Sequence, residues 1–192
     1  MWLFAHHRGA PDPCDLWGIL GDPDDERPGN IAKYLCKKVY VLSKKHSFIL
    51  KPGPWLGEGK ISLSMAEEAM PFFTRWKVPE PDEKGRIDSL QEIQISGLQD
   101  MMQNQFSFYD ITPKGFQIEL QNQSLGKVVG KGMINEKLIG WEFRLDHLGF
   151  EGFEFYEKGE APDTYLLHAE YATNDDFRTV IHGKVWRPVE EG

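Results

Sequence analysis

The chain has 192 residues and a formal net charge of −8, from 30 acidic and 22 basic side chains. This length suits one domain with a sizeable core, and no apolar run approaches the roughly 18 residues that a membrane-spanning helix needs. The acidic balance argues against a nucleic-acid-binding surface that extends over the whole protein.

The first residues predict no export signal. The chain lacks a basic start, and only four apolar residues follow Met1, whereas a secretory signal needs about 7–15. Cys14 and Cys36 form no Cys-x-x-Cys motif, and two thiols cannot make a disulfide framework. We therefore expect a cytoplasmic protein with two free thiols.

Two segments precede the predicted strands. Residues 1–29 are rich in Pro, Asp and Gly, which break helices and strands, so we expect a loop or a loosely attached tail. Residues 30–47 predict a basic amphipathic helix with Asn30 as its N-cap. The apolar side chains on one face of this helix are Ile31, Tyr34, Leu35, Val39 and Leu42.

The basic charge is concentrated in residues 27–51. No acidic residue lies between Glu26 and Glu58. A basic amphipathic helix can bind an anionic membrane surface or partner, and the lysines that would do so are Lys33, Lys37, Lys38, Lys44 and Lys45. The favoured interpretation is that the helix instead packs on or caps the following domain, with its lysines facing acidic groups there.

From about residue 54 the periodicity changes from 3.6 to 2. Apolar and polar residues alternate in eight short runs, as expected for antiparallel strands covered on one side. The runs lie at residues 60–65, 70–78, 92–95, 106–108, 116–121, 139–145, 165–171 and 177–185. Turn signals separate them, and the stretch 149–153 breaks the alternation, which predicts a bulge or sharp bend.

These runs predict a mainly β domain over residues 48–192. Eight to ten strands joined by tight turns, without a crossover helix, form a meander whose edges must be protected. Closure into an antiparallel up-and-down barrel protects them completely, and a two-sheet sandwich protects them partly. We favour the barrel and keep the sandwich as the alternative.

The first predicted strand carries a family resemblance. Gly53-Pro54-Trp55 matches the Gly-x-Trp opening of lipocalins, and residues 55–59 match the Trp-x-Gly-x-Gly stretch of nitrobindin-like haem barrels. The chain thus resembles the calycin superfamily of lipocalin, fatty-acid-binding and nitrobindin-like barrels. The resemblance implies that Trp55 closes one barrel end beneath an arginine near the C-terminus, here Arg187 or Arg178.

The resemblance also implies a ligand inside the barrel. Secreted lipocalins have a signal peptide and usually a disulfide, so an intracellular relative is the better comparison. Nitrobindin-like proteins bind haem through a histidine in a late strand, and His182 before Gly183 occupies such a strand with a different spacing. Haem therefore stands as an alternative ligand.

The apolar strand faces should line the barrel interior. Ten aromatic side chains there are enough to fill it largely, while hydroxyls of Thr74, Thr179, Tyr165 and Tyr171 among apolar groups are typical of a ligand pocket. Both possibilities stay open. For a small apolar ligand bound without catalysis, the predicted contacts are Trp55, Trp76, Phe108, Trp141, Phe143, Tyr165 and Tyr171.

The polar faces of the last strands carry the remaining chemistry. Their acids and bases are Glu142, Arg144, His168, Glu170, Arg178, His182 and Lys184. Because side chains alternate between the two faces of a strand, this set should lie on a solvated outer face. The alternative, an enzyme that uses Glu142, His168 or His182, requires those groups to face the lumen. The six histidines show no zinc-site spacing, so no metal is expected, and the sequence gives no oligomeric state.

Overall fold

The computed structural model describes Val39, Leu42 and residues 46–146, 149–174 and 177–189. The predicted tail at 1–29, both cysteines and the five lysines of the predicted partner site lie outside the described residues. Of the predicted helix at 30–47, Val39, Leu42, His46 and Ser47 are described; the first three are buried and Ser47 is partly buried. No helix in the described part of the chain is long and apolar enough to cross a membrane.

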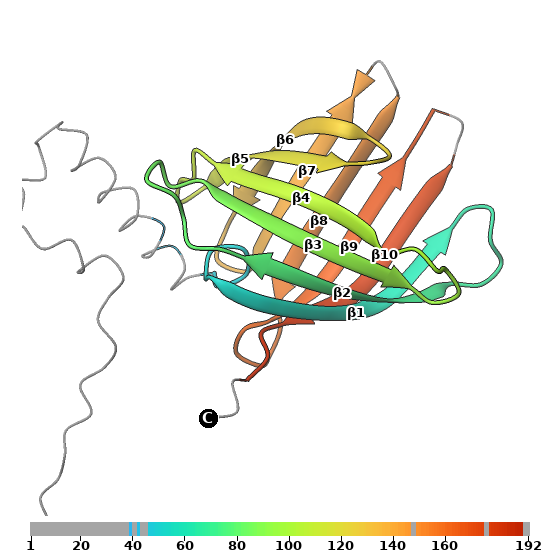
Figure 1. Cartoon of the computed structure of the whole chain (residues 1–192), viewed down its shortest axis with the longest axis horizontal. Helices are drawn as coiled ribbons and strands as arrows, with labels where there is room; N and C mark the ends of the chain where they lie inside the picture. The colour runs from blue at the N-terminus through green and yellow to red at the C-terminus, as the bar shows by residue number, and fades with distance from the viewer. Residues whose placement is uncertain (1–38, 40–41, 43–45, 147–148, 175–176, 190–192) are drawn as a thin grey trace, which may run out of the picture.

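Ten strands form the domain (Figure 1). They are β1 (Gly53–Leu63), β2 (Met70–Val78), β3 (Ile87–Ile95), β4 (Met102–Tyr109), β5 (Gly115–Asn122), β6 (Gly126–Ile134), β7 (Leu138–Leu145), β8 (Phe150–Lys158), β9 (Thr164–Ala172) and β10 (Arg178–Trp186).

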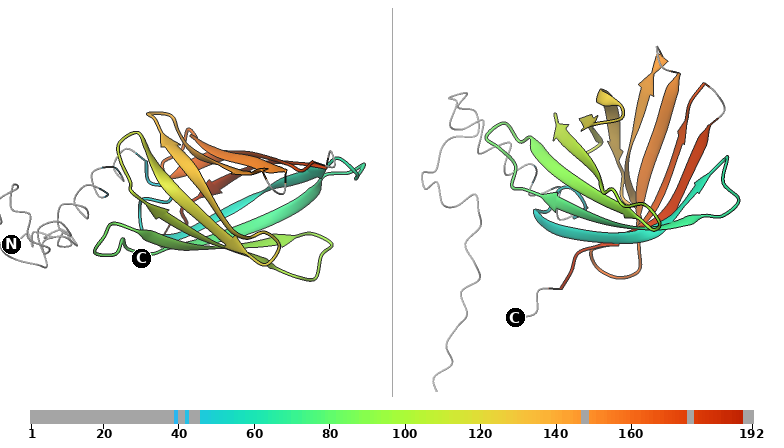
Figure 2. Two further views of the ribbon diagram at one scale, coloured as in Figure 1. Left: turned by 90° about the horizontal axis from the view of Figure 1, so that it is seen from above. Right: turned by 45° about the vertical axis from the view of Figure 1, so that its right-hand side comes forward.

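The strands form a closed antiparallel barrel. Each strand pairs with its neighbours in sequence, and β1 pairs with β10 from Leu56 opposite Trp186 to Leu63 opposite Thr179. Figure 2 shows the sheet curving around so that its first and last strands lie side by side. The predicted up-and-down barrel is confirmed, and the sandwich alternative is wrong because no free edge remains.

Two strands lie outside the eight alternating runs. In β6, glycines occupy inward positions that elsewhere carry apolar side chains. In β8, Phe150 and Tyr156 point inward while Phe153 lies on the outer face, so aromatic residues occur on both sides. The expected bend precedes this strand, at Gly149 with a φ of 56°. From Phe150 onward β8 pairs with β7 without a break.

Glycines in the strands make room for aromatic side chains in the lumen. A Cβ atom on Gly132 would collide with the ring of Phe116, and one on Gly152 would collide with the ring of Tyr171. In each case the glycine lies on one strand and its aromatic partner directly opposite on the next. The glycine therefore serves the packing, because the neighbouring ring occupies the space of its missing side chain.

One end of the barrel, which we call the closed end, is sealed by residues 46–51. Phe48, Ile49 and Leu50 of this plug are buried. The Phe48 ring lies 5.3 Å from Trp55 and 4.3 Å from Tyr156. Hydrogen bonds fix the plug to the strand ends, because His46 Nε2 lies 2.7 Å from the Asn135 carbonyl oxygen and the Ser47 amide donates to the Tyr165 hydroxyl.

The opposite end, which we call the mouth, is less well covered. Inward-facing hydrophobic residues there are only partly buried and pack on the rim of the core; they are Leu63, Met70, Ile93, Leu145, Tyr171 and Ile181. Met102, at the inward start of β4, is 44% exposed. The lumen is therefore graded, from fully buried at the plug to partly exposed at the mouth.

Candidate functional site

A carboxyl group lies inside the barrel, between the aromatic core and the mouth. Glu154 on β8 is buried and faces the lumen together with Tyr156 on the same strand. The Tyr156 hydroxyl donates to Glu154 Oε2 at 2.8 Å, and the Tyr171 hydroxyl donates to Oε1. A buried carboxyl group is costly without such partners, so the two tyrosines are what makes this position tolerable for an acid.

Burial governs the protonation of this cluster. Removal from water raises the pKa of Glu154, and the hydrogen bonds from Tyr171 and Tyr156 offset only part of that effect. Burial and the nearby carboxylate also raise the pKa values of Tyr156 and Tyr171 well above the ordinary value, so both hydroxyls stay protonated as donors. The cluster therefore presents a carboxyl group with two fixed donors to the lumen.

Two indole N–H groups lie beside this cluster. Trp141 on β7 lies directly opposite Glu154, and its N–H acts toward that carboxyl as a third donor that helps to lower the pKa. The ring of Trp76 on β2 lies 6.3 Å from that of Trp141, and its buried Nε1 has no hydrogen-bond partner among the described residues. A buried donor without a partner is rare in native proteins because it carries a desolvation cost. Trp76 therefore marks this part of the lumen as a place where an additional polar group can be accepted.

Toward the mouth, three side-chain amides cross the inner face of the sheet. Asn104 on β4 donates to Gln91 Oε1 on β3 at 2.8 Å, and Asn122 on β5 donates to Asn104 Oδ1 at 3.0 Å. Inward-facing amides replace apolar side chains at these positions. The mouth half of the lumen is thus mixed in polarity, which is typical of ligand sites rather than of a fully apolar core.

The predicted ligand contacts are inward-facing but divide between the two halves. Trp55 and Tyr165 lie against the plug, with ring distances to Phe48 of 5.3 and 5.7 Å. Phe108 packs 5.7 Å from Trp141. Trp76 lies opposite Trp55 and 5.4 Å from the Phe48 ring. Positions nearer the Glu154 cluster and the mouth are those of Trp141, Phe143 and Tyr171. Whether any of them contacts a ligand stays a prediction.

The predicted barrel-closing pair is located at the closed end. Trp55 is fully buried, and its indole Nε1 donates to the Lys51 carbonyl oxygen at 3.4 Å. The Arg187 guanidinium lies against Gly53, where a Cβ atom would come within 2.9 Å of it. This places the arginine two residues from Trp55 along β1, and the function of the pair stays a prediction.

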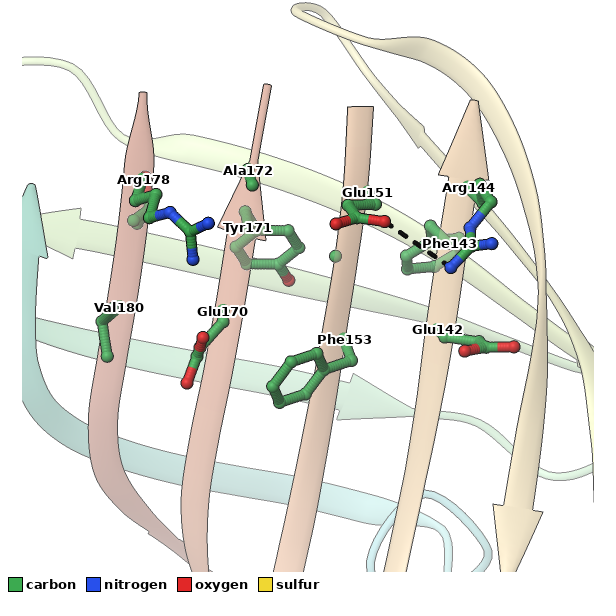
Figure 3. A pocket seen from close by; sticks show the side chains of 12 residues that line it. Glu142, Phe143, Arg144, Glu151, Phe153, Glu170, Tyr171, Ala172, Arg178 and Val180 are labelled. Atoms are coloured by element: carbon green, nitrogen blue, oxygen red, sulfur yellow. Dashed lines mark ion pairs between the residues drawn. The ribbon is translucent and has the colours of Figure 1, made fainter. Parts of the chain in front are cut away.

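The acids and bases of the last strands lie on the outer face. Glu142, Arg144, Arg178 and His182 are exposed, and Figure 3 shows several of these side chains around a shallow groove over β7–β10. The groove has a volume of about 240 Å³ and contains Phe153. Arg144 pairs with Glu151 across it at 3.5 Å. The predicted solvated outer face is confirmed.

This placement removes the basis of the enzyme hypothesis. Catalysis by Glu142, His168 or His182 required these side chains to lie inside the barrel. The structure places them on the outer face of the sheet, whereas their strand neighbours Trp141, Phe143 and Ala169 are buried on the inner face. Nor does any group of three or more His, Cys, Asp or Glu side chains among the described residues suit a metal ion. His182 faces away from the lumen, so it is not placed to hold a haem there.

Sequence reasoning missed Glu154, the plug and the amide row. Glu154 follows Phe153 and precedes Phe155, so strand parity was ambiguous where both faces carry aromatic residues. The inward assignment required Gly152 to be recognised as a packing position. Residues 46–51 span the end of the predicted helix at 47 and the start of the predicted β domain at 48, and the apolar run Phe48, Ile49 and Leu50 was the available signal for a buried segment.

Comparisons with known proteins show a fold and no family. No protein-family model and no curated protein matches the chain. An S-type phycobiliprotein lyase, CPES from Guillardia theta, superposes with a TM-score of 0.57 at 11% identity, covering 83% of this chain and 98% of the lyase. An N-terminal dehydratase from the difficidin assembly line gives a TM-score of 0.23 at 9% identity, covering 83% and 85%. The first likeness supports the β-barrel fold, and the second adds nothing to it.

Proposed function

We propose that the chain binds one small, mostly apolar molecule in the mouth half of the barrel, without catalysis. The observation that carries this proposal is the graded lumen. Inward-facing residues are sealed at the plug and partly exposed at the mouth, as at Met102 and Tyr171. A barrel that only needed a core would gain stability from burying those side chains as well.

The polarity of the lumen supports the same proposal. The aromatic walls supply apolar surface, and the unpaired indole N–H of Trp76, the indole of Trp141 and the Glu154 carboxyl supply a few fixed polar groups. That combination characterises small-molecule sites. In this proposal Trp141, Phe143 and Tyr171 contact the ligand, while Trp55, Trp76, Phe108 and Tyr165 form the floor beneath it.

The structural neighbour bears on the fold alone. The lyase CPES has the same barrel over nearly its whole length, but 11% identity carries neither its activity nor its substrate to this chain. It supports the proposal only in that a barrel of similar shape and size occurs in a protein that has a biochemical activity. The ligand of the present chain has to be found by experiment.

Two measurements test the proposal. Native mass spectrometry of the full chain, purified from a lipid-rich host, should show a bound small molecule, and a fluorescent fatty acid should bind and be displaced by competing apolar ligands. Ile181→Trp, which fills the mouth, should abolish probe binding. Val180→Trp is the matched control, since Val180 is the adjacent residue on the outer face.

The proposal fails if no probe binds and no mass is retained, or if both tryptophan variants reduce binding equally. Folding of each variant is checked by circular dichroism, so a general loss of structure is recognised. Thr179→Trp, at the mouth opposite Tyr171, provides a second blocking variant if Ile181→Trp does not fold.

A further inference from the structure

We propose that His168 and His182 form a two-histidine site for a borderline divalent cation, zinc or copper, on the outer face of the barrel. The two residues are directly opposite each other on β9 and β10. Their Nδ1 atoms lie 3.1 Å apart and their ring centroids 4.6 Å apart. The site is independent of the lumen and of any ligand bound there.

The distance between the two nitrogens fits a shared metal ion. Histidine nitrogens bind zinc at about 2.0–2.1 Å, and with these bonds a separation near 3.1 Å corresponds to an N–Zn–N angle of roughly 95–100°. This angle lies between the octahedral and tetrahedral values. The separation of the two Nδ1 atoms is therefore compatible with both of them binding one ion.

A carboxylate already orients one of the two imidazoles. Glu170 Oε1 lies 3.0 Å from Nε2 of His168, on the side of the ring away from His182. When Nε2–H donates to this carboxylate, the neutral ring presents an unprotonated Nδ1 toward His182. Metal-bound histidines commonly have such a carboxylate partner, which fixes the tautomer and strengthens the ligand.

The surroundings hold the pair in place and leave it reachable. The Phe155 ring lies 4.9 Å from His168, which it faces across β8 and β9. His182 is exposed, so water can complete the coordination. The charged groups that face the pair are Glu170 on β9, Lys60 opposite His182 on β1, and Lys184 on β10, whose ammonium group pairs with Glu58 at 3.1 Å.

Metal binding at this site uses both imidazoles in their neutral form. In the His182 tautomer that carries its proton on Nδ1, that proton moves to Nε2, and the freed Nδ1 binds the ion. His168 keeps its Nε2 proton on Glu170. Imidazole ligands suit zinc, copper and nickel, with copper bound more tightly than zinc, and binding should weaken in acid because both rings must be neutral.

The test is calorimetric titration of the full chain with zinc chloride, with copper chloride as the second metal. We expect saturable binding of one ion, tighter for copper, and an at least tenfold loss of affinity in both His168→Gln and His182→Gln. Glu170→Gln should lose roughly tenfold, the lower range for removing a carboxylate partner. Imidazole nitrogen shifts in NMR spectra should change at these two histidines.

The matched control is the double variant His6→Gln and His7→Gln, because adjacent histidines can bind metal without any folded site. It should retain the affinity of the wild type. The proposal is overturned if no saturable binding occurs up to millimolar zinc, if His168→Gln and His182→Gln leave the affinity unchanged, or if the control variant abolishes binding.

Discussion

The two ends of the barrel differ in what covers them. At the closed end, a plug of consecutive apolar residues packs on Trp55, Tyr156 and Tyr165, and backbone groups of the plug bond to side chains of the strands. At the mouth, inward-facing positions carry amides and partly exposed hydrophobic residues. The same sheet thus supports a rigid floor and an accessible opening, and stability and binding should respond to different residues.

The largest effect should come from the plug. Phe48 is fully buried and contacts Trp55, Trp76, Tyr156 and Tyr165. We expect Phe48→Ala to lower the free energy of unfolding by about 3–5 kcal/mol, since the sealed end cannot collapse around the cavity. Urea denaturation measures this loss. Met70→Ala at the mouth is the control and should cost clearly less; equal losses would contradict the difference between the ends.

The next effect should come from a glycine within the sheet. Gly132→Ala places a methyl group into the ring of Phe116, and such overpacking typically costs about 1–3 kcal/mol. Thermal unfolding should show a lowered midpoint. Adding Phe116→Leu should recover part of the loss, because the smaller side chain frees the space. Strictly additive losses in the double variant would show that the ring is not the cause.

A smaller, pH-dependent effect is expected at Glu154. Burial raises the folded-state pKa of this carboxyl, so its contribution favours the folded state below the unfolded-state pKa and is lost as the pH rises through the folded-state value. Glu154→Gln should flatten this decline and be relatively more stable in the alkaline range, by on the order of 1 kcal/mol, the scale of one buried hydrogen bond. Unfolding curves from pH 4 to pH 9 provide the measurement; parallel pH profiles would refute the assignment.

The smallest effect should come from the ion pair that fastens the plug. Lys51 Nζ lies 2.9 Å from Asp163 Oδ2. Partial burial acts to raise the pKa of Asp163, but hydrogen bonds from Ser47 and Lys51 outweigh it and lower the pKa. The stabilisation is therefore present above the unfolded-state pKa and lost as the pH falls through the folded-state value.

Asp163→Asn should cost about 0.2–1 kcal/mol at neutral pH, as expected for a half-exposed pair, and should cost nothing once the carboxyl is protonated in the wild type. High salt should reduce the difference. A cost that persists at low pH would contradict a role of Asp163 through its charge, because asparagine tolerates the positive φ of 51° at this position as well as aspartate does.

The sequence was sufficient to predict the barrel because most strands bury one face only. Runs such as Phe116, Ile118 and Leu120 against polar neighbours identify the inner side directly. Alternation does not identify the inner face where that face is not apolar or where both faces are aromatic. In β6 the inner positions include Gly130 and Gly132, whose space is filled by rings from adjacent strands, and this cannot be recognised without the pairing register.

The site was less predictable for a related reason. Glu154 lies between two phenylalanines and reads as a surface acid, because strand periodicity assigns an acid to the solvent side unless its hydrogen-bond partners are known. Its partner Tyr171 comes from another strand. In contrast, the outer cluster around His168 and His182 was assigned to the correct face, but the direct opposition of the two rings depends on the β9–β10 register.

The pairing of β1 with β10 has a consequence for how the chain folds. The backbone groups along the free edge of β1 find partners only when β10 has formed. The final closure therefore joins segments more than a hundred residues apart in the sequence. We therefore expect slow closure. Before closure, the sheet has two unpaired edges, at β1 and β10, which can pair with another chain. Glu58 and Lys60 on β1, with Lys184 on β10, place charges along this seam, and charged side chains of this kind discourage such pairing until the ring of strands is complete.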